Sequence, residues 1–357
     1  MTAVPTEGAS AKPSRRHPAA VLDDTTNAVA GRLLRALGWV PGVVPYAGYG
    51  AAPGVAGCHG DGGWVRVLAR VLLTRPSRYG RPVPPRRGWR QFLTAAVPGA
   101  VVVVTVGGRE HQVVADRSGV VDVVLPSPLP PGEHPVEISA GHGEPLRAAV
   151  VVHGSDTRSG LVSDIDDTVM VTWLPRPLLA AWNAFVVHES ARRVVPGMSQ
   201  LYRRLADGHR PLGVWYLSTG AWNAAPALSR FLRRHGYPFG PLLLTDWGPT
   251  NSGWFRSGRE HKSRELLRLA AEFPGLQWIL VGDDGQHDPE IYRDFVRACP
   301  GRVRAVALRL LTPTEQVLSR GRLGGGDGAH LAGVVVVEDS DGHALGRRLE
   351  DAGIVPA

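Results

Sequence analysis

The segment LVSDIDDT, residues 161–168, decides the fold class of this chain. A short apolar run, Leu161–Ser163, predicts a buried strand, and the carboxylates of Asp164, Asp166 and Asp167 follow it directly. Downstream, apolar runs of strand length alternate with segments of helical spacing, which predicts βαβ units and a mainly parallel sheet. Ligands of such sheets bind at the carboxyl ends of the strands, so we look for chemistry in the residues that follow each strand.

The carboxyl-terminal region, residues 156–357, carries this α/β alternation. The expected strands are Leu161–Ser163, Gly213–Leu217, Pro241–Leu244, Trp278–Val281, Val303–Leu310 and Gly333–Val337. The expected helices are Leu178–Ser190, Met198–Ala206, Ala224–His235, Glu260–Glu272, Pro289–Ala298 and one near Ala344–Ala352. About 50 residues separate Thr168 from Ser218, and two of these helices take up most of them, so a large cap domain over the strand ends is not expected.

The amino-terminal region has a different texture. Residues 1–20, rich in Pro, Ala, Ser and Arg, predict a disordered arm, and residues 21–63 predict a helix followed by a glycine-rich connection. Residues 64–155 predict a small β-sandwich domain that acts as a scaffold or docking module. Its expected strands are Val65–Leu72, Ala100–Val106, His111–Ala115, Val120–Leu125, His134–Ile138 and Arg147–Val152.

The composition sets the protein class. Hydrophobic residues make up 43% and charged residues 20%, which excludes wholesale disorder and a fibrous fold. No run of 18 or more apolar residues lacks a breaker, and neither a secretory signal nor a disulfide framework is evident, so we expect a cytoplasmic chain without a transmembrane helix. The net charge of +8 favours anionic partners, namely nucleic acid, phosphorylated substrates or an anionic membrane, without choosing among them.

Two strand ends carry residue types suited to phosphoryl chemistry. Asp164 and Asp166, spaced i and i+2, suit a nucleophile and a general acid/base around a hard cation such as Mg²⁺, although a solvated turn or a helix cap would also use aspartates. Ser218, Thr219 and Gly220 follow the second strand, where a hydroxyl suits a phosphoryl oxygen and an ordinary helix cap is the alternative.

Two further features complete the pattern. Lys262 is one of only two lysines among 40 basic residues, and it lies at a helix start, where the helix dipole disfavours a cation. A compact charge beside a phosphate or a carboxylate would explain it, and chance is the alternative. Asp283 and Asp288, in the segment GDDGQHD that follows the strand at 278–281, are positioned to complete an Mg²⁺ site.

In this order, the motifs resemble those of the haloacid dehalogenase-like phosphohydrolase superfamily. The segments DIDDTV, YLSTGAWN, PFGPLLL and HKSRELLRLAAEFPGLQWILVGDDGQHDPEIY narrow the resemblance to the actin-patch type of phosphatidate phosphatase catalytic domain, a relative of lipin. The resemblance covers about residues 160–315, and VPYAGYG at 44–50 also looks like bacterial proteins of this kind. It implies a capless, Rossmann-like parallel sheet preceded by the small β-sandwich.

The resemblance also implies a mechanism. Asp164 would attack phosphorus and form an aspartyl-phosphate, and Asp166 would protonate the leaving group and then activate water. Ser218 would bind phosphoryl oxygens, with Thr219 and Gly220 as further substrate-binding residues. Lys262 would offset the negative charge. Thr168 would belong to the substrate-binding residues. An Mg²⁺ site would be made by Asp164, the Asp166 carbonyl, Asp283 and Asp288.

The implied partner is a phospholipid or a membrane surface, with no nucleic acid and with an undetermined oligomeric state. We expect a cytoplasmic protein, peripheral on the inner face of the membrane, with a membrane-contact rim made by Trp173, Leu174, Trp254 and Phe255; packing of these residues in the core is the alternative. A phosphatase acting on a phosphoprotein or another phosphomonoester, and a non-catalytic anionic-lipid-binding module, stay open as alternative functions.

Overall fold

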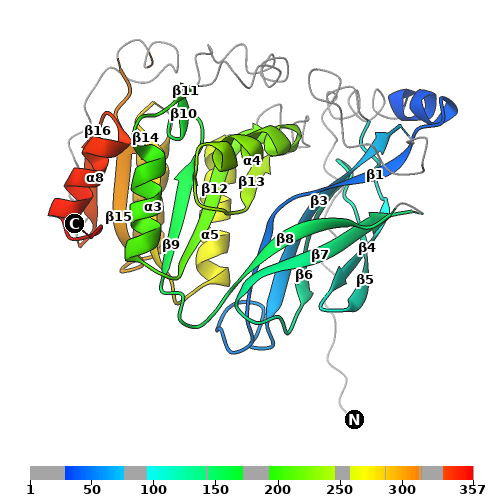
Figure 1. Cartoon of the computed structure of the whole chain (residues 1–357), viewed down its shortest axis with the longest axis horizontal. Helices are drawn as coiled ribbons and strands as arrows, with labels where there is room; N and C mark the ends of the chain where they lie inside the picture. The colour runs from blue at the N-terminus through cyan, green and yellow to red at the C-terminus, as the bar shows by residue number, and fades with distance from the viewer. Residues whose placement is uncertain are drawn as a thin grey trace, which may run out of the picture.

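The carboxyl-terminal part of the chain is built on a six-stranded parallel sheet. The computed structural model describes residues 29–75, 95–141, 144–171, 193–245, 258–285, 287–312, 315 and 333–356. The strand order is β13-β12-β9-β14-β15-β16, with β9 inside the sheet between β12 and β14 (Figure 1). The bounds are β9 Ser159–Asp164, β12 Leu212–Ala221, β13 Leu242–Thr245, β14 Gln277–Asp283, β15 Val303–Arg309 and β16 Val335–Asp339.

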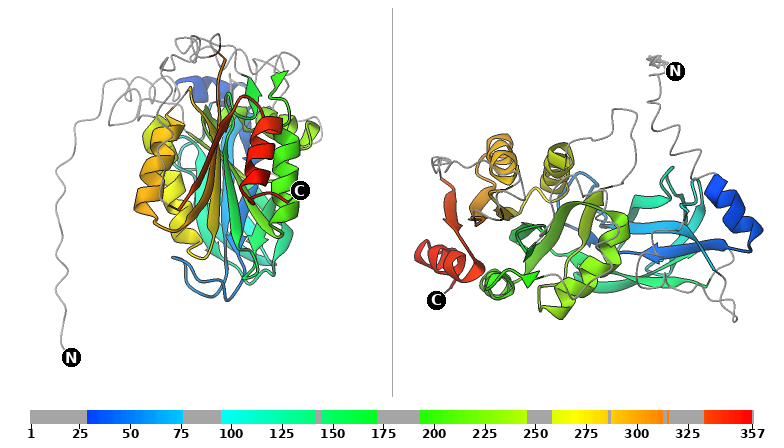
Figure 2. Two further views of the ribbon diagram at one scale, coloured as in Figure 1. Left: turned by 90° about the vertical axis from the view of Figure 1, so that its left-hand side faces the viewer. Right: turned by 90° about the horizontal axis from the view of Figure 1, so that it is seen from above.

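Helices cover both faces of this sheet. One face carries α3, α4 and α8, and the other carries α5 and α6, which gives three layers (Figure 2). The bounds are α3 Met198–Gly208, α4 Ala225–Arg234, α5 Gly258–Glu272, α6 Asp288–Ala298 and α8 Gly342–Asp351, with a 3-10 turn, η4, at Trp222–Ala224. All of the strands predicted for this region, and each helix predicted within the described residues, are therefore confirmed.

Burial explains why these segments take these forms. All six residues of β9 are buried, as expected for a strand covered on both faces by helices. In α3 the buried side chains are Met198, Leu201, Tyr202 and Leu205, which lie on one face at helical spacing. The predicted helix at 178–190 and the predicted rim residues Trp173, Leu174, Trp254 and Phe255 lie outside the described residues.

A short antiparallel pair, β10 Met170–Val171 and β11 Arg193–Val194, was not predicted. It follows the loop after β9 and lies at the end of the molecule where the strands of the parallel sheet terminate (Figure 1). Two-residue strands carry too little alternation to be recognised in a sequence. Among the described residues, no helix is long and apolar enough to span a membrane.

The amino-terminal part forms an eight-stranded sheet with the order β1-β3-β2-β8-β7-β4-β5 and with β6 paired to β3. The sheet folds back on itself, so that β1 contacts β7 and β8. The expected sandwich is thus one continuous sheet, bridged by β2, around a valine-rich core. The bounds are β1 Val40–Pro45, β2 Gly48–Ala51, β3 Trp64–Thr74, β4 Val101–Val106, β5 Arg109–Val114, β6 Val120–Pro126, β7 Gly132–Ala140 and β8 Leu146–His153.

Two of these strands, β1 and β2, lie within residues 21–63, where the sequence predicted a helix and a glycine-rich connection. The glycines of β2 explain why this strand was not recognised in the sequence. A side chain at Gly48 would lie 2.3 Å from the Arg66 carbonyl oxygen, and one at Gly50 would lie 2.1 Å from the Trp64 carbonyl oxygen. These glycines permit a close approach of two backbones, and they look like a connection when only the sequence is read.

Candidate active site

The loop after β9 presents the first two candidate residues. Asp164 is the last residue of β9 and is buried, whereas Asp166, two residues on, is partly exposed. Asp167 has φ 59°, and within the described ranges it is the one non-glycine residue with a positive φ. Its N–H donates to the Met170 carbonyl at 2.8 Å, so the chain reverses immediately after the strand. This reversal keeps the carboxylates of Asp164 and Asp166 at the carboxyl ends of the parallel strands.

Lys262 lies in the first turns of α5 and joins two carboxylates. Its Nζ is 2.6 Å from Asp164 Oδ1 and 2.6 Å from Asp288 Oδ1. Burial by itself lowers the pKa of this lysine, but the facing carboxylates of Asp164, Asp288 and Asp283 outweigh burial and raise the pKa above its usual value. The ammonium is therefore charged, and it explains why a lysine stands at a helix start in an arginine-rich chain.

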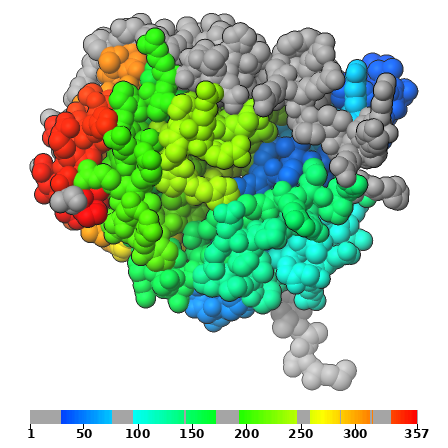
Figure 3. Space-filling view, viewed as in Figure 1, coloured from blue at the N-terminus to red at the C-terminus, as the bar shows by residue number. Residues whose placement is uncertain are grey.

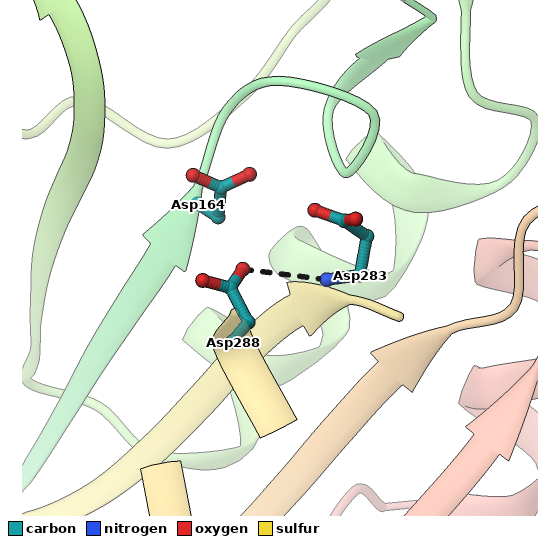
Figure 4. A group of neighbouring side chains, drawn as sticks. All are labelled: Asp164, Asp283 and Asp288. Carbon is teal, nitrogen blue, oxygen red and sulfur yellow. Dashed lines mark hydrogen bonds between the residues drawn. The ribbon is translucent and has the colours of Figure 1, made fainter. Parts of the chain in front are cut away.

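Three buried carboxylates meet at the ends of β9, β14 and α6. Asp164, Asp283 and Asp288 each have an oxygen within 4.8 Å of the other two (Figure 4). Burial raises the pKa of Asp164 and of Asp283, and the neighbouring carboxylates add to that effect. If all three are ionised, one ammonium leaves two negative charges uncompensated, which is costly in a buried site.

The cluster has the chemistry of a site for a hard divalent cation. Its donors are carboxylate oxygens, the ligand type that Mg²⁺ prefers. Asp164 Oδ2 is buried and has no hydrogen-bond partner in the part of the chain that the structure describes. A cation at this oxygen would satisfy it and would balance the excess charge, so the residues present fit a bound metal.

The loop that holds Asp283 and Asp288 has a defined geometry. Asp288 is the first residue of α6, and its Oδ2 accepts from the Asp283 N–H at 3.4 Å. Asp283 Oδ1 accepts from the Gly285 N–H at 2.8 Å. A side chain at Gly282 would lie 2.5 Å from Asp288 Oδ2, so the glycine before Asp283 leaves room for the second carboxylate.

The end of β12 supplies hydroxyl and amide groups. Ser218 Oγ donates to Asp166 Oδ2 at 2.9 Å and accepts from the Gly220 N–H at 2.9 Å. Thr245 Oγ1 donates to the Thr219 carbonyl at 2.8 Å and fixes the next residue of the loop. Ser218 thus connects the partly exposed carboxylate of Asp166 in the first loop to the backbone of the second loop.

The structure brings six predicted residues into one site: Asp164, Asp166, Ser218, Lys262, Asp283 and Asp288. Thr219 and Gly220 lie at the same strand end. Thr168 is fully buried, and its Oγ1 has no hydrogen-bond partner among the described residues. A role of this threonine in substrate binding stays a prediction.

One residue that the sequence analysis missed supports the first loop. Arg309 is the last residue of β15 and is buried. Its Nη1 donates to the Asp167 carbonyl at 2.7 Å, and its Nη2 lies 2.8 Å from Glu315 Oε1. A charged residue at the end of a strand otherwise rich in apolar residues was the available signal.

The amino-terminal sheet reaches the second loop, which was also not foreseen. Tyr46, which follows β1, stacks on Trp222 with ring centroids 4.8 Å apart, and its hydroxyl donates to the Trp222 carbonyl at 3.3 Å. Arg70 of β3 donates through Nη1 to Asn223 Oδ1. These contacts hold the turn immediately after Ala221, the last residue of the strand that carries Ser218.

The similarity to a known protein family lies within the carboxyl-terminal α/β part of the chain. Residues 159–310 match the family model described as "Phosphatidate phosphatase APP1, catalytic domain". Over these residues the chain is similar to the APP1-type catalytic domain. The family expected from the motifs is thereby confirmed for this segment, which is less than half of the chain.

Two curated relatives match part of the chain. Phosphatidate phosphatase APP1 of Saccharomyces cerevisiae is 27% identical over 171 residues, which cover 47% of this chain and 29% of the yeast protein. An uncharacterised protein of Schizosaccharomyces pombe is 22% identical over 150 residues, covering 42% of this chain and 24% of its own length. The chain thus spans less than a third of the length of each of these relatives.

Similarity to solved structures is slight. A carbohydrate acetylesterase from Xanthomonas citri aligns over 72% of this chain and 69% of its own, with 12% identity and a TM-score of 0.26. An FMN-binding β-glucuronidase aligns over 76% of this chain and 40% of its own, with 12% identity and a TM-score of 0.22. These values are too low to carry a conclusion about fold or activity.

Proposed function

We propose that this chain is a phosphatidate phosphatase, an Mg²⁺-dependent phosphomonoester hydrolase of the haloacid dehalogenase-like type that converts phosphatidate to diacylglycerol. The observation that carries the proposal is the contact of Lys262 with two buried carboxylates, Asp164 and Asp288, directly beside the pair Asp166–Ser218. A carboxylate repels a phosphate dianion unless cations offset its charge, and this arrangement supplies one such cation and the ligands for another.

In the first step, an oxygen of Asp164 attacks phosphorus while the bond from phosphorus to the leaving oxygen breaks. Asp166, protonated at this stage, gives its proton to the departing alkoxide, which leaves as diacylglycerol. In the second step, Asp166 takes a proton from water as the water oxygen attacks the phosphorus of the aspartyl-phosphate. Inorganic phosphate leaves, Asp164 is free again, and Asp166 holds a proton for the next cycle.

The other residues of the site would position the reacting groups and offset negative charge. Ser218 Oγ holds Asp166 at 2.9 Å, and the hydroxyl and amide groups at the end of β12 are placed to bind phosphoryl oxygens. Asp164, the carbonyl of Asp166 and Asp283 would hold Mg²⁺, and Asp288 would orient that group through Lys262 and the Asp283 N–H. When bound, the metal supplies positive charge beside the transferring phosphoryl group.

We further propose that the substrate is presented at a membrane surface and that the protein is a cytoplasmic, peripheral one. The support is the short interval between Thr168 and Ser218, which leaves no room for a large cap and favours a large or surface-bound substrate over a small free metabolite.

The test is a substrate panel assayed with Mg²⁺ and with EDTA. Phosphatidate in mixed micelles, a phosphopeptide and p-nitrophenyl phosphate are compared for the wild type, Asp164→Asn and Asp166→Asn. We expect phosphate release from phosphatidate to require Mg²⁺ and to fall by orders of magnitude in both variants, because each removes a reacting group.

The alternatives give different results in the same panel. Preference for the phosphopeptide would move the function to a protein phosphatase. Absence of turnover on every substrate, with phosphatidate still bound, would leave a lipid-binding module. Retention of more than about a tenth of the wild-type kcat by Asp164→Asn would remove this residue as the nucleophile.

A further inference from the structure

The helix formed by residues 29–36 exposes an apolar face. Val29, Leu33 and Leu37 are 55%, 61% and 75% exposed, and their i, i+4, i+8 spacing puts them on one side. Val40, at the start of β1, is 41% exposed. Four of the nine large exposed apolar side chains in the described residues thus fall within twelve consecutive positions, which is more clustering than scattered surface leucines and valines explain.

The opposite side of this segment is fixed to the protein. Leu34 and Trp39 pack against the valine-rich core of the eight-stranded sheet. The Trp39 N–H donates to the Leu34 carbonyl at 2.9 Å, and the Arg75 guanidinium lies over the Trp39 ring, 5.3 Å from its centre. The helix therefore has one face anchored in the sheet and the other turned outward, so its outward orientation is set by packing.

The charged residues around the exposed face of the helix indicate which kind of partner it could bind. Arg32 and Arg35 are exposed on the helix, and Arg75 is exposed beside it. No aspartate or glutamate occurs from Val29 to Gly60. An apolar stripe flanked by arginines alone suits the boundary between acyl chains and headgroups in a membrane that contains anionic lipid, where the leucines enter the apolar layer and the guanidinium groups meet phosphates.

The position of the helix relates it to the candidate active site. In Figure 1 and in the left view of Figure 2, which share a vertical axis, the blue helix lies at the same end of the molecule as the carboxyl ends of the parallel strands. Figure 3 shows blue atoms of this segment at the upper right-hand margin of the molecular surface. One flat surface at that end would meet the helix and the side on which Asp164 lies.

We propose that residues 29–40 dock onto an anionic lipid bilayer and hold the carboxyl-end edge of the parallel sheet toward that bilayer. The docking follows from exposure, packing and charge in the amino-terminal segment. Its purpose, the delivery of a lipid phosphomonoester to Asp164, rests on the proposed function.

The test measures co-sedimentation of the full chain with vesicles that contain no phosphatidate, so binding is read without turnover. Vesicles of phosphatidylcholine are compared with vesicles of phosphatidylcholine and phosphatidylglycerol. We expect the wild type to pellet with the anionic vesicles and Leu33→Gln/Leu37→Gln to lose at least about tenfold in partitioning, since each leucine contributes apolar area. Leu33→Ala/Leu37→Ala, which keeps a strong helix former, should lose binding in the same direction.

A matched control removes apolar area elsewhere. Phe239→Gln/Leu267→Gln changes two side chains that are 52% and 47% exposed on the α/β part, and it should bind like the wild type. Arg32→Gln/Arg35→Gln should weaken binding to the anionic vesicles and flatten its dependence on salt. All of these variants should keep the wild-type rate on p-nitrophenyl phosphate.

Equal pelleting of Leu33→Gln/Leu37→Gln and the wild type would overturn the proposal, and so would equal binding of the wild type to neutral and anionic vesicles. Loss of vesicle binding in the Phe239→Gln/Leu267→Gln control would also overturn it. Asp164→Asn should bind vesicles normally. A phosphatidate assay without turnover, combined with normal vesicle binding, would count against the proposed function and leave the docking surface standing.

Discussion

Replacing Lys262 by arginine should reduce turnover almost as much as replacing it by alanine. The ammonium lies 2.6 Å from one oxygen of Asp164 and 2.6 Å from one oxygen of Asp288, in a side chain that is 3% exposed. A planar guanidinium is larger and cannot occupy the position of one compact charge between two buried oxygens. Both variants therefore remove the geometry, although only alanine removes the charge.

The expected size follows from the two charged hydrogen bonds. Each bond to a charged group contributes roughly 1.5–3 kcal/mol, so the loss of both in Lys262→Ala corresponds to about 3–6 kcal/mol. At about 1.4 kcal/mol for each factor of ten, kcat/KM should fall by roughly two to four orders of magnitude. In Lys262→Arg, the extra atoms lower the free energy of unfolding by about 1–3 kcal/mol and move the two carboxylates apart. Because neither bond can then form with its present geometry, we expect the loss in kcat/KM to approach that of Lys262→Ala.

The assay is phosphate release from p-nitrophenyl phosphate, which avoids effects of membrane binding, with thermal unfolding recorded for each variant. Arg264→Ala is the matched control, because Arg264 lies in the same helix with a side chain that is 57% exposed. It should retain wild-type kcat. If Lys262→Arg stays within about tenfold of wild type while folded, the argument for a compact charge is wrong and the lysine is incidental.

Three further predictions test the surroundings of the site. Arg309→Met should lower both kcat and the free energy of unfolding, the latter by about 3–5 kcal/mol, since it frees the Asp167 carbonyl and removes the cation that faces the Glu315 carboxylate; an unchanged kcat would show that the turn holds without it. Arg70→Ala and Asn223→Ala, measured alone and together, should show a coupling of about 0.5–3 kcal/mol in kcat/KM, whereas additive losses would separate the amino-terminal sheet from the catalytic loop. Burial lowers the pKa of His153 to about 4, so between pH 6.5 and 4 the unfolded chain binds a proton that the folded chain does not, and the stability present above pH 6.5 is lost as the pH falls. His153→Phe should remove about 2 kcal/mol of the loss in the free energy of unfolding at pH 5, measured by urea unfolding. An unaltered pH dependence of stability would contradict this prediction.

The features that could be predicted from the sequence are those that depend on residues close together in the chain. Strands such as β9 and β14 were found because apolar runs end in aspartates, and the carboxyl ends of parallel strands converge by topology. The convergence of Asp164 and Asp283 therefore needed no knowledge of packing. By contrast, Arg309 contacts a residue 142 positions away, and Tyr46 contacts one 176 positions away. Nothing near either residue in the sequence indicates such a partner.

The amino-terminal sheet contacts the elements that carry the candidate active site. Tyr49 of β2 donates to Glu272 Oε2 at 2.7 Å, and Arg66 of β3 lies 2.6 Å from Glu272 Oε1. Glu272 ends α5, the helix whose first turns carry Lys262. One helix therefore connects a carboxylate buried against the amino-terminal sheet to the ammonium that contacts Asp164, and the far end of that helix is held by residues outside the segment that matches the APP1-type family. The Tyr46–Trp222 stack lies on the Ser218 side of the same site, so the sheet contacts two of the elements that converge on Asp164.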